Sequence, residues 1–144
     1  MIPRRSFQAP AITFLFLALS SCATYRMSRE QLFAQIYNAT PESATTRHSA
    51  MIGTQRYTTN GVKEIRCYDK HGSQCVLANS PRLEMRITCN NGKKRLFYFD
   101  TILLEDSVFS GCNSRILGTR KSVKYNDIKT VELQDGRKAY YYAQ

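Results

Sequence analysis

The residues best suited to chemistry in this 144-residue chain are its five cysteines. Four of them lie after residue 60, and their spacing contains no C-x-x-C pair: Cys67, Cys75, Cys89 and Cys112. Neither of the two histidines forms a zinc-binding pattern with them, so we expect no metal site. An even number of cysteines indicates two disulfides if the protein is exported to an oxidising compartment. Four cysteines allow three pairings, and spacing alone does not choose among them.

Local geometry favours one of these pairings. Residues 62–68 and 74–77 read as two short strands around a turn at residues 69–73. A three-residue loop in that turn, with Gly72 in the left-handed conformation, places Cys67 directly opposite Cys75. Cross-strand cysteines in that position are within reach of a disulfide. The pair Cys89 and Cys112 is then left by default and needs curvature or closure of the sheet to form.

Basic residues outnumber acidic ones by 21 to 11, which gives a formal net charge of +10. The densest cluster flanks a predicted turn at residues 90–92: Arg82, Arg86, Lys93, Lys94 and Arg95. Such a cluster can bind a polyanion, and it can equally be a set of solvated charges that protects an edge strand. A second group has the same two interpretations: Arg115, Arg120, Lys121 and Lys124.

Sequence signatures of enzymes are missing from the chain. It contains no G-x-S-x-G frame, no H-E-x-x-H and no glycine-rich phosphate loop before a helix. The one adjacent carboxylate pair, Glu105 and Asp106, falls in a predicted turn, where turn chemistry explains it. We therefore expect a non-enzymatic protein that uses no cofactor.

The N-terminus has the composition of a secretory signal. Arg4 and Arg5 form a basic start, residues 11–19 are apolar except for one threonine, and Ser20 and Ser21 follow. The apolar run is far shorter than the roughly 20 residues that a membrane-spanning helix needs. We therefore expect the segment to be a signal peptide that is removed.

The tetrad Leu19-Ser20-Ser21-Cys22 resembles the lipobox of bacterial lipoproteins. The resemblance covers the signal alone. It implies that diacylglycerol is attached to the Cys22 thiol, that the chain is cut between Ser21 and Cys22, and that in many species the new amino group is acylated. Two or more acyl chains make desorption from a membrane negligible. The alternative is an ordinary signal in which Cys22 merely follows the cleavage site.

The residue after Cys22 bears on the destination. In lipoproteins of two-membrane bacteria an aspartate there favours retention in the inner membrane, and here the residue is Ala23. The resemblance therefore implies an outer-membrane protein that faces the periplasm. Removal of the signal takes away two arginines and leaves a charge of 19 − 11 = +8. Since nucleic acid is no routine partner in the envelope, we expect the membrane and an envelope protein as partners. The alternative partner is lipopolysaccharide, anionic lipid or peptidoglycan, bound through the basic surface.

The rest of the chain predicts a fold that is mainly β: an antiparallel meander forming a curved sheet or small barrel, with one short N-terminal amphipathic helix. A capping box at Ser28 and Gln31 starts the helix, and a hairpin turn is expected at residues 134–136. The expected divisions are a signal peptide (1–21), a lipidated N-terminus with helix and polar loop (22–60), and a β domain (61–144).

Overall fold

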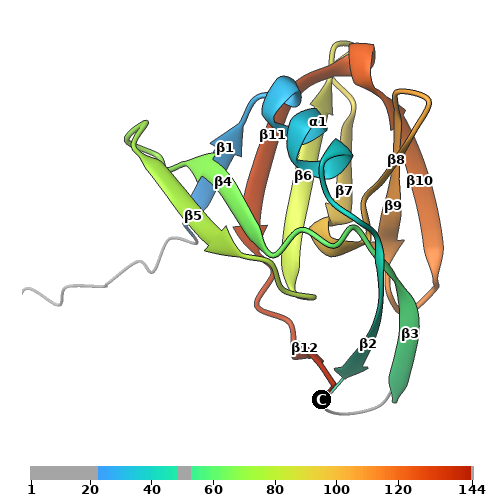
Figure 1. Cartoon of the computed structure of the whole chain (residues 1–144). Helices are drawn as coiled ribbons and strands as arrows, with labels where there is room; N and C mark the ends of the chain where they lie inside the picture. Colours follow the sequence, from blue (N-terminus) through green and yellow to red (C-terminus); the bar gives the residue numbers. More distant parts are fainter. Residues whose placement is uncertain (1–22, 49–52, 144) are drawn as a thin grey trace, which may run out of the picture.

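The computed structural model describes residues 23–48 and 53–143, which form a mainly β protein with antiparallel sheets and one α-helix (Figure 1). The predicted signal peptide and Cys22 lie outside the described residues. The elements are β1 (Thr24–Met27), α1 (Arg29–Tyr37), β2 (Glu42–His48), β3 (Thr54–Thr59), β4 (Glu64–Tyr68), β5 (Gln74–Ala78), β6 (Leu83–Cys89), β7 (Lys94–Tyr98), η1 (Phe99–Thr101), β8 (Leu103–Glu105), β9 (Val108–Ser114), β10 (Thr119–Lys124), η2 (Tyr125–Asp127), β11 (Ile128–Asp135) and β12 (Tyr140–Tyr142).

The strands are divided among three sheets, where the sequence predicted a single curved sheet or small barrel. The largest has six strands in the order β5-β4-β1-β11-β6-β7, and two three-stranded sheets have the orders β10-β9-β8 and β12-β2-β3. The meander is interrupted because β1, which precedes the helix in sequence, lies between β4 and β11 and is antiparallel to both. Its four residues were too few to give a strand signal in the sequence.

The helix α1 begins where its capping box predicts. The Ser28 hydroxyl accepts a hydrogen bond from the backbone N–H of Gln31 at 3.0 Å. The side-chain oxygen of Gln31 accepts one from the backbone N–H of Ser28 at 2.9 Å. Leu32 and Ile36 are buried in the core, so the apolar face packs on the protein. In Figure 1 the helix lies in front of β6 and β11. Among the described residues, no helix has the length and apolar content needed to cross a membrane.

Strands β2 and β3 pair as a hairpin in the segment 39–60, which the sequence indicated as a loop or a loosely held edge, and β3 is the edge strand of its sheet. Strands β2 and β3 pair along their length, and β12 adds to the other edge of β2. The segment is rich in threonine, whose branched side chain favours strands, and Thr46 and Thr59 are buried. Gly61 follows with a φ of +74°, and a Cβ there would overlap the carbonyl of Thr40. The two ends of the hairpin are therefore held together by backbone contact.

The predicted tight hairpin at residues 134–136 is wrong. Strand β12 pairs with β2 instead of β11. The amide of Gly136 donates to the carbonyl of Arg82 at 2.9 Å, and a Cβ on Gly136 would lie 2.6 Å from the Glu84 carboxylate. The chain therefore continues past the main sheet along the start of β6 before it forms β12.

Candidate functional site

The five basic residues predicted to bind a polyanion are not brought together. Lys93, Lys94 and Arg95 lie at the turn between β6 and β7, with Lys93 and Lys94 exposed. That turn borders a hollow of about 220 Å³, which is lined in part by Cys89 and Asn90. A smaller basic cluster of three residues therefore remains at this end of the sheet.

The other two predicted residues are engaged elsewhere. Arg82 lies at the opposite end of β6 and binds Asp135 through two hydrogen bonds of 2.8 and 2.9 Å. Arg86 lies in the middle of β6, and its Nη1 is 4.0 Å from a carboxylate oxygen of Glu132. Both arginines lie beside carboxylates, which partly neutralise their charge and weaken any attraction to a polyanion.

The cysteines follow the predicted register in one hairpin. Cys67 of β4 pairs with Cys75 of β5, which confirms the predicted opposition, and the two Sγ atoms are 3.3 Å apart. Burial, together with the hydrogen bond to Cys75, raises the pKa of the Cys67 thiol to about 12. The structure holds both as thiols, and their disulfide stays a prediction. His71 is exposed at the tip of this hairpin.

The remaining cysteines are held in different surroundings. Cys89 ends β6 opposite Ile128. Cys112 of β9 lies opposite Arg120, and its amide donates to the hydroxyl of Thr101 at 2.8 Å. The geometry therefore gives no support to a bridge between Cys89 and Cys112.

A buried carboxylate, which sequence reasoning missed, organises the end of the sheet near β12. Asp100 is fully buried in η1, and its Oδ1 accepts from Arg115 Nη2 at 2.7 Å. Its Oδ2 accepts from the hydroxyls of Tyr57 and Tyr142, the latter at 3.0 Å. The signal that could have indicated this acid is its position in residues 96–104, a run in which Asp100 is the only charged residue.

Arg115 closes the other side of this cluster. Only 3% of its surface is exposed, and it also donates to the Pro81 carbonyl from Nε at 3.1 Å and from Nη2 at 2.8 Å. Its guanidinium lies 4.4 Å from the ring centre of Tyr98 and 5.4 Å from that of Tyr140. Arg115 had been interpreted as part of a surface basic group, and the structure corrects this because the side chain is buried against a carboxylate and aromatic rings.

The electrostatics of the cluster favour a charged Arg115 and neutral tyrosines. Burial, reinforced by the Asp100 carboxylate, raises the pKa of both Tyr57 and Tyr142 well above the usual range. Burial acts to lower the pKa of Arg115, but the attraction of Asp100 outweighs it and the net shift is upward. We name Asp100, Arg115, Tyr57 and Tyr142 the tyrosine cage.

The cage is joined to the start of β1 by one row of side chains. The cross-strand partners Thr24, Gln134, Glu84 and Tyr98 follow one another across β1, β11, β6 and β7. Gln134 donates to Glu84 at 3.2 Å, while Lys138 binds Glu84 at 3.1 Å and the Tyr98 hydroxyl at 2.8 Å. Polar contacts therefore link Gln134, the residue opposite Thr24, through Glu84 and Lys138 to Tyr98, whose ring lies against Arg115 of the cage.

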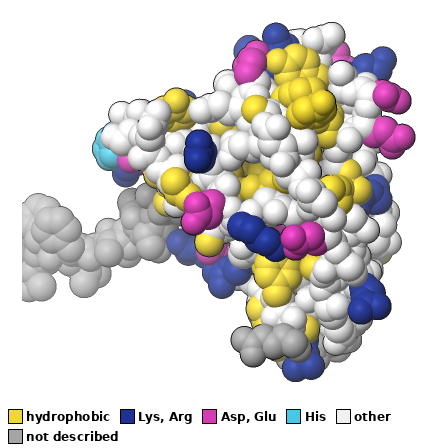
Figure 2. All heavy atoms as spheres, in the orientation of Figure 1, with side chains coloured by type: hydrophobic (Ala, Val, Ile, Leu, Met, Phe, Trp, Pro, Cys, Tyr) yellow, Lys and Arg dark blue, Asp and Glu magenta, His cyan; other side chains and the backbone are white. Residues whose placement is uncertain are grey.

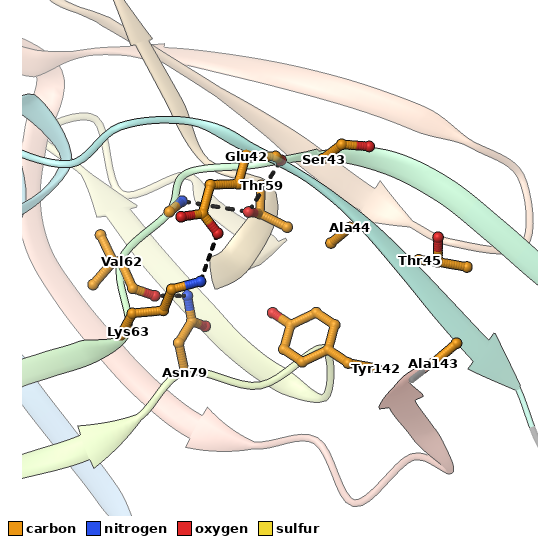
Figure 3. A pocket seen from close by; sticks show the side chains of 11 residues that line it. Glu42, Ser43, Ala44, Thr45, Thr59, Val62, Lys63, Asn79, Tyr142 and Ala143 are labelled. Atoms are coloured by element: carbon orange, nitrogen blue, oxygen red, sulfur yellow. Dashed lines mark hydrogen bonds and ion pairs between the residues drawn. The ribbon is translucent and has the colours of Figure 1, made fainter.

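A hollow of about 360 Å³ opens beside the cage, between β2, the chain after β3 and the C-terminal strand (Figure 3). The Tyr142 ring faces into it, and an ion pair of 2.6 Å between Lys63 and Glu42 crosses one end. Asn79 donates to the Val62 carbonyl at 2.8 Å, and its buried Oδ1 has no hydrogen-bond partner in the described part of the chain. The hollow therefore has a carboxylate, an ammonium and a tyrosine in its lining, with the two charges paired to each other and the tyrosine hydroxyl bound to Asp100.

In the described part of the chain, the side chains that could hold a metal do not gather. Within residues 23–48 and 53–143, no three side chains of His, Cys, Asp or Glu are placed to bind one ion. The carboxylate of Asp100 already accepts three hydrogen bonds, so its capacity is used in holding the fold.

The chain matches no protein-family model, no curated protein and no solved structure.

Proposed function

We propose that this protein is a lipid-anchored envelope protein, attached through Cys22 to the outer membrane and facing the periplasm. Its β domain binds another envelope protein and acts as an accessory or assembly factor, without catalysis. The observation that carries the proposal is the position of β1. One residue, Ala23, separates Cys22 from this strand, and β1 is an interior strand of the six-stranded sheet.

This connection leaves no room for a flexible tether. A typical tether of polar residues lets an anchored domain move over tens of ångströms. Here the strand that follows the anchor is hydrogen-bonded to β11 and β4, so the body is held at the membrane surface. A domain fixed in this way suits a component that waits for, or holds, a partner in the same membrane.

The surface that best fits a protein partner is the sheet β12-β2-β3. Tyr141 and Tyr142 are 46% and 38% exposed there, and Tyr142 also lines the hollow with Glu42 and Lys63. Tyrosines beside polar groups are typical of protein interfaces, since each ring gives a large contact area at low entropic cost. The tyrosine cage holds this sheet against the main sheet through Tyr57 and Tyr142, so the surface is preorganised.

A second function is favoured by the smaller basic cluster. Lys93 and Lys94 are exposed, and neither makes an ion pair with a described residue. Together with Arg95 they could bind phosphate or carboxylate groups of lipopolysaccharide or peptidoglycan. Salt separates the two functions, because a screened polyanion contact weakens sharply between low and moderate salt and a packed interface does not.

The experiment is cross-linking in intact cells, followed by mass spectrometry of the proteins that co-purify with the full chain. A Cys22→Ser variant is the matched control for the anchor, and a Lys93→Gln/Lys94→Gln variant is the control for the basic cluster. One dominant protein partner that is lost with Cys22→Ser and kept with the lysine variant supports the proposal. Recovery of glycan or lipid alone, removed by salt and by the lysine variant, supports the second function. Membrane fractionation of Cys22→Ser like the parent would refute the anchor.

A further inference from the structure

The start of β1 lies beside a hollow of about 360 Å³ that the proposed function does not use. Its apolar lining comes from Tyr25, Leu77 and Leu83, and its rim includes Ala23, Arg137 and Asp135, whose carboxylate is paired with Arg82. Ala23 is exposed, so the chain enters the protein at the edge of this hollow. Any group attached at residue 22 is therefore next to a hollow with an apolar floor and a rim where Arg137 stands beside the paired Arg82 and Asp135.

The Arg137 side chain on this rim is able to bind an anion. Arg137 is exposed, and its side chain makes no hydrogen bond or ion pair with any described residue. Arg82 lies nearby in its pair with Asp135, and both remain open to solvent. Figure 2 shows Lys and Arg side chains gathered at this end of the molecule, below the hairpin of β4 and β5. The chemistry fits a phosphate above a glycerol and the first carbons of acyl chains.

The number of residues between the anchor and β1 limits the distance between the membrane and this end of the protein. Two residues, Cys22 and Ala23, precede β1, and an extended chain covers at most about 3.6 Å per residue. Ala23, on the rim of the hollow, is therefore within about 7 Å of the anchored residue. That reach is slightly shorter than the Debye length of about 8 Å at physiological salt, so salt weakens but does not abolish the attraction between headgroups beside the anchor and the charges on this rim.

We propose that this anchor-side face, formed by Ala23, Ala78, Ser80, Arg82 and Arg137, rests on the leaflet that holds the anchor. The hollow then takes the headgroup of an anionic phospholipid, with Arg137 on the phosphate. This inference rests on the proposed lipidation of Cys22. It also orients the molecule, because β6 carries the turn with Lys93 about 20 Å away from the leaflet. The smaller basic cluster is thereby directed away from the leaflet's own lipids.

The chain has no tryptophan, so a single introduced tryptophan reports its own distance from the lipid. The test uses the full, processed chain in vesicles of phosphatidylglycerol and phosphatidylcholine that carry a nitroxide quencher on some headgroups. Ala78→Trp places the reporter on the anchor-side face. Asn126→Trp is the matched control, because Asn126 is also exposed and neutral and lies at the opposite end beside Asn90.

We expect quenching at least about twofold stronger for Ala78→Trp than for Asn126→Trp, since the two sites differ by about 20 Å along the strands. A linker of about ten Gly and Ser residues after Ala23, which extends the reach by about 17 Å, should reduce this difference. Arg137→Gln should also reduce it, while Lys121→Gln on β10 should leave it unchanged. Equal quenching at both reporters would overturn the inference, and an unchanged result in vesicles of phosphatidylcholine alone would overturn the anionic headgroup.

The same preparation separates this inference from the proposed function. Mass spectrometry of the processed chain shows whether Cys22 carries lipid, and flotation shows whether the protein binds vesicles. If the chain is lipidated and floats but both reporters are quenched equally, the anchor stands and the docked face is wrong. If the chain is unlipidated, the proposed anchor and this inference are both wrong.

Discussion

Replacing Asp100 by asparagine removes one negative charge from the tyrosine cage and changes almost nothing in shape. The buried guanidinium of Arg115 then keeps its positive charge, with a neutral amide at the position of its partner. Water cannot compensate, because Asp100 is fully buried and Arg115 is 3% exposed. The substitution therefore tests whether the charge pair, more than the packing around it, holds the sheet β12-β2-β3 in place.

The size of the effect follows from this burial. Breaking a buried ion pair by removing one partner costs about 3–5 kcal/mol, because an uncompensated charge remains. That is a large part of the total of about 5–15 kcal/mol expected for a domain of this size. The cation–π contacts of Arg115 with Tyr98 and Tyr140 remain and offset a minor share. We expect the melting temperature to fall by roughly 10–20 °C.

The assay is urea unfolding followed by circular dichroism, with Asp135→Asn as the matched control. Asp135, like Asp100, forms an ion pair with an arginine, and it accepts two hydrogen bonds from Arg82. The pair of Asp135 differs in lying on the surface. Its loss should leave the free energy of unfolding almost unchanged, because exposed pairs are weak. A double variant, Asp100→Asn with Arg115→Met, should recover part of the stability lost in Asp100→Asn, because no unpaired charge is left.

Two results would refute this reasoning. If Asp100→Asn loses no more stability than Asp135→Asn, the buried charge pair is not a major determinant of the fold. If Asp100→Asn is strongly destabilised and the double variant with Arg115→Met is less stable still, the loss comes from packing and hydrogen bonds and not from an unpaired charge.

Three further predictions concern single residues. The pKa of Tyr57 is raised in the folded state, so its contribution to the free energy of unfolding is complete below about pH 10 and is lost as the pH rises above that value. The variant Tyr57→Phe should therefore lose less stability than the parent between neutral and alkaline pH. Equal slopes of the free energy of unfolding against pH in the two proteins would contradict this. Gly61→Ala should destabilise far more than Gly92→Ala in thermal melts, because both have positive φ but only Gly61 meets backbone, and equal losses would count against the contact. In chain recovered from an oxidising compartment, peptide mapping under non-reducing conditions should join Cys67 to Cys75; free thiols at both positions would contradict the disulfide.

Features of the fold that depend on neighbouring residues were predictable from the sequence. The capping box at Ser28 identified the start of α1, because the two hydrogen bonds involve residues three positions apart. The opposition of Cys67 and Cys75 followed from the loop length and the left-handed Gly72, whose φ is +77°. In both cases the turn or cap fixes the geometry within a few residues.

Features that depend on distant partners were not predictable in this way. The sequence can show that Asp100 stands among apolar residues, but its partners Tyr57, Arg115 and Tyr142 come from three other parts of the chain. The short strand β1 likewise becomes a strand because β11 and β4 offer it hydrogen bonds on both edges. Hydrophobic periodicity in the sequence cannot reveal the Asp100 cluster or strand β1. The segments that form them are too short to show a period.

The row of contacts that begins beside β1 lies next to the proposed anchor, and this has a physical consequence. A chain attached to a membrane directly before a strand transmits any pull on the anchor into that strand and its neighbours. Strand β1 is hydrogen-bonded on both edges, and the row from Gln134 through Glu84 to Tyr98 ties its partners to the tyrosine cage. The strand resists such a force through its full pairing with β11 and through one further pair, Arg26 with Tyr68, on the side of β4. An anchored domain without a tether therefore needs this end to be cross-linked by contacts between distant residues, which are the contacts that local sequence patterns do not show.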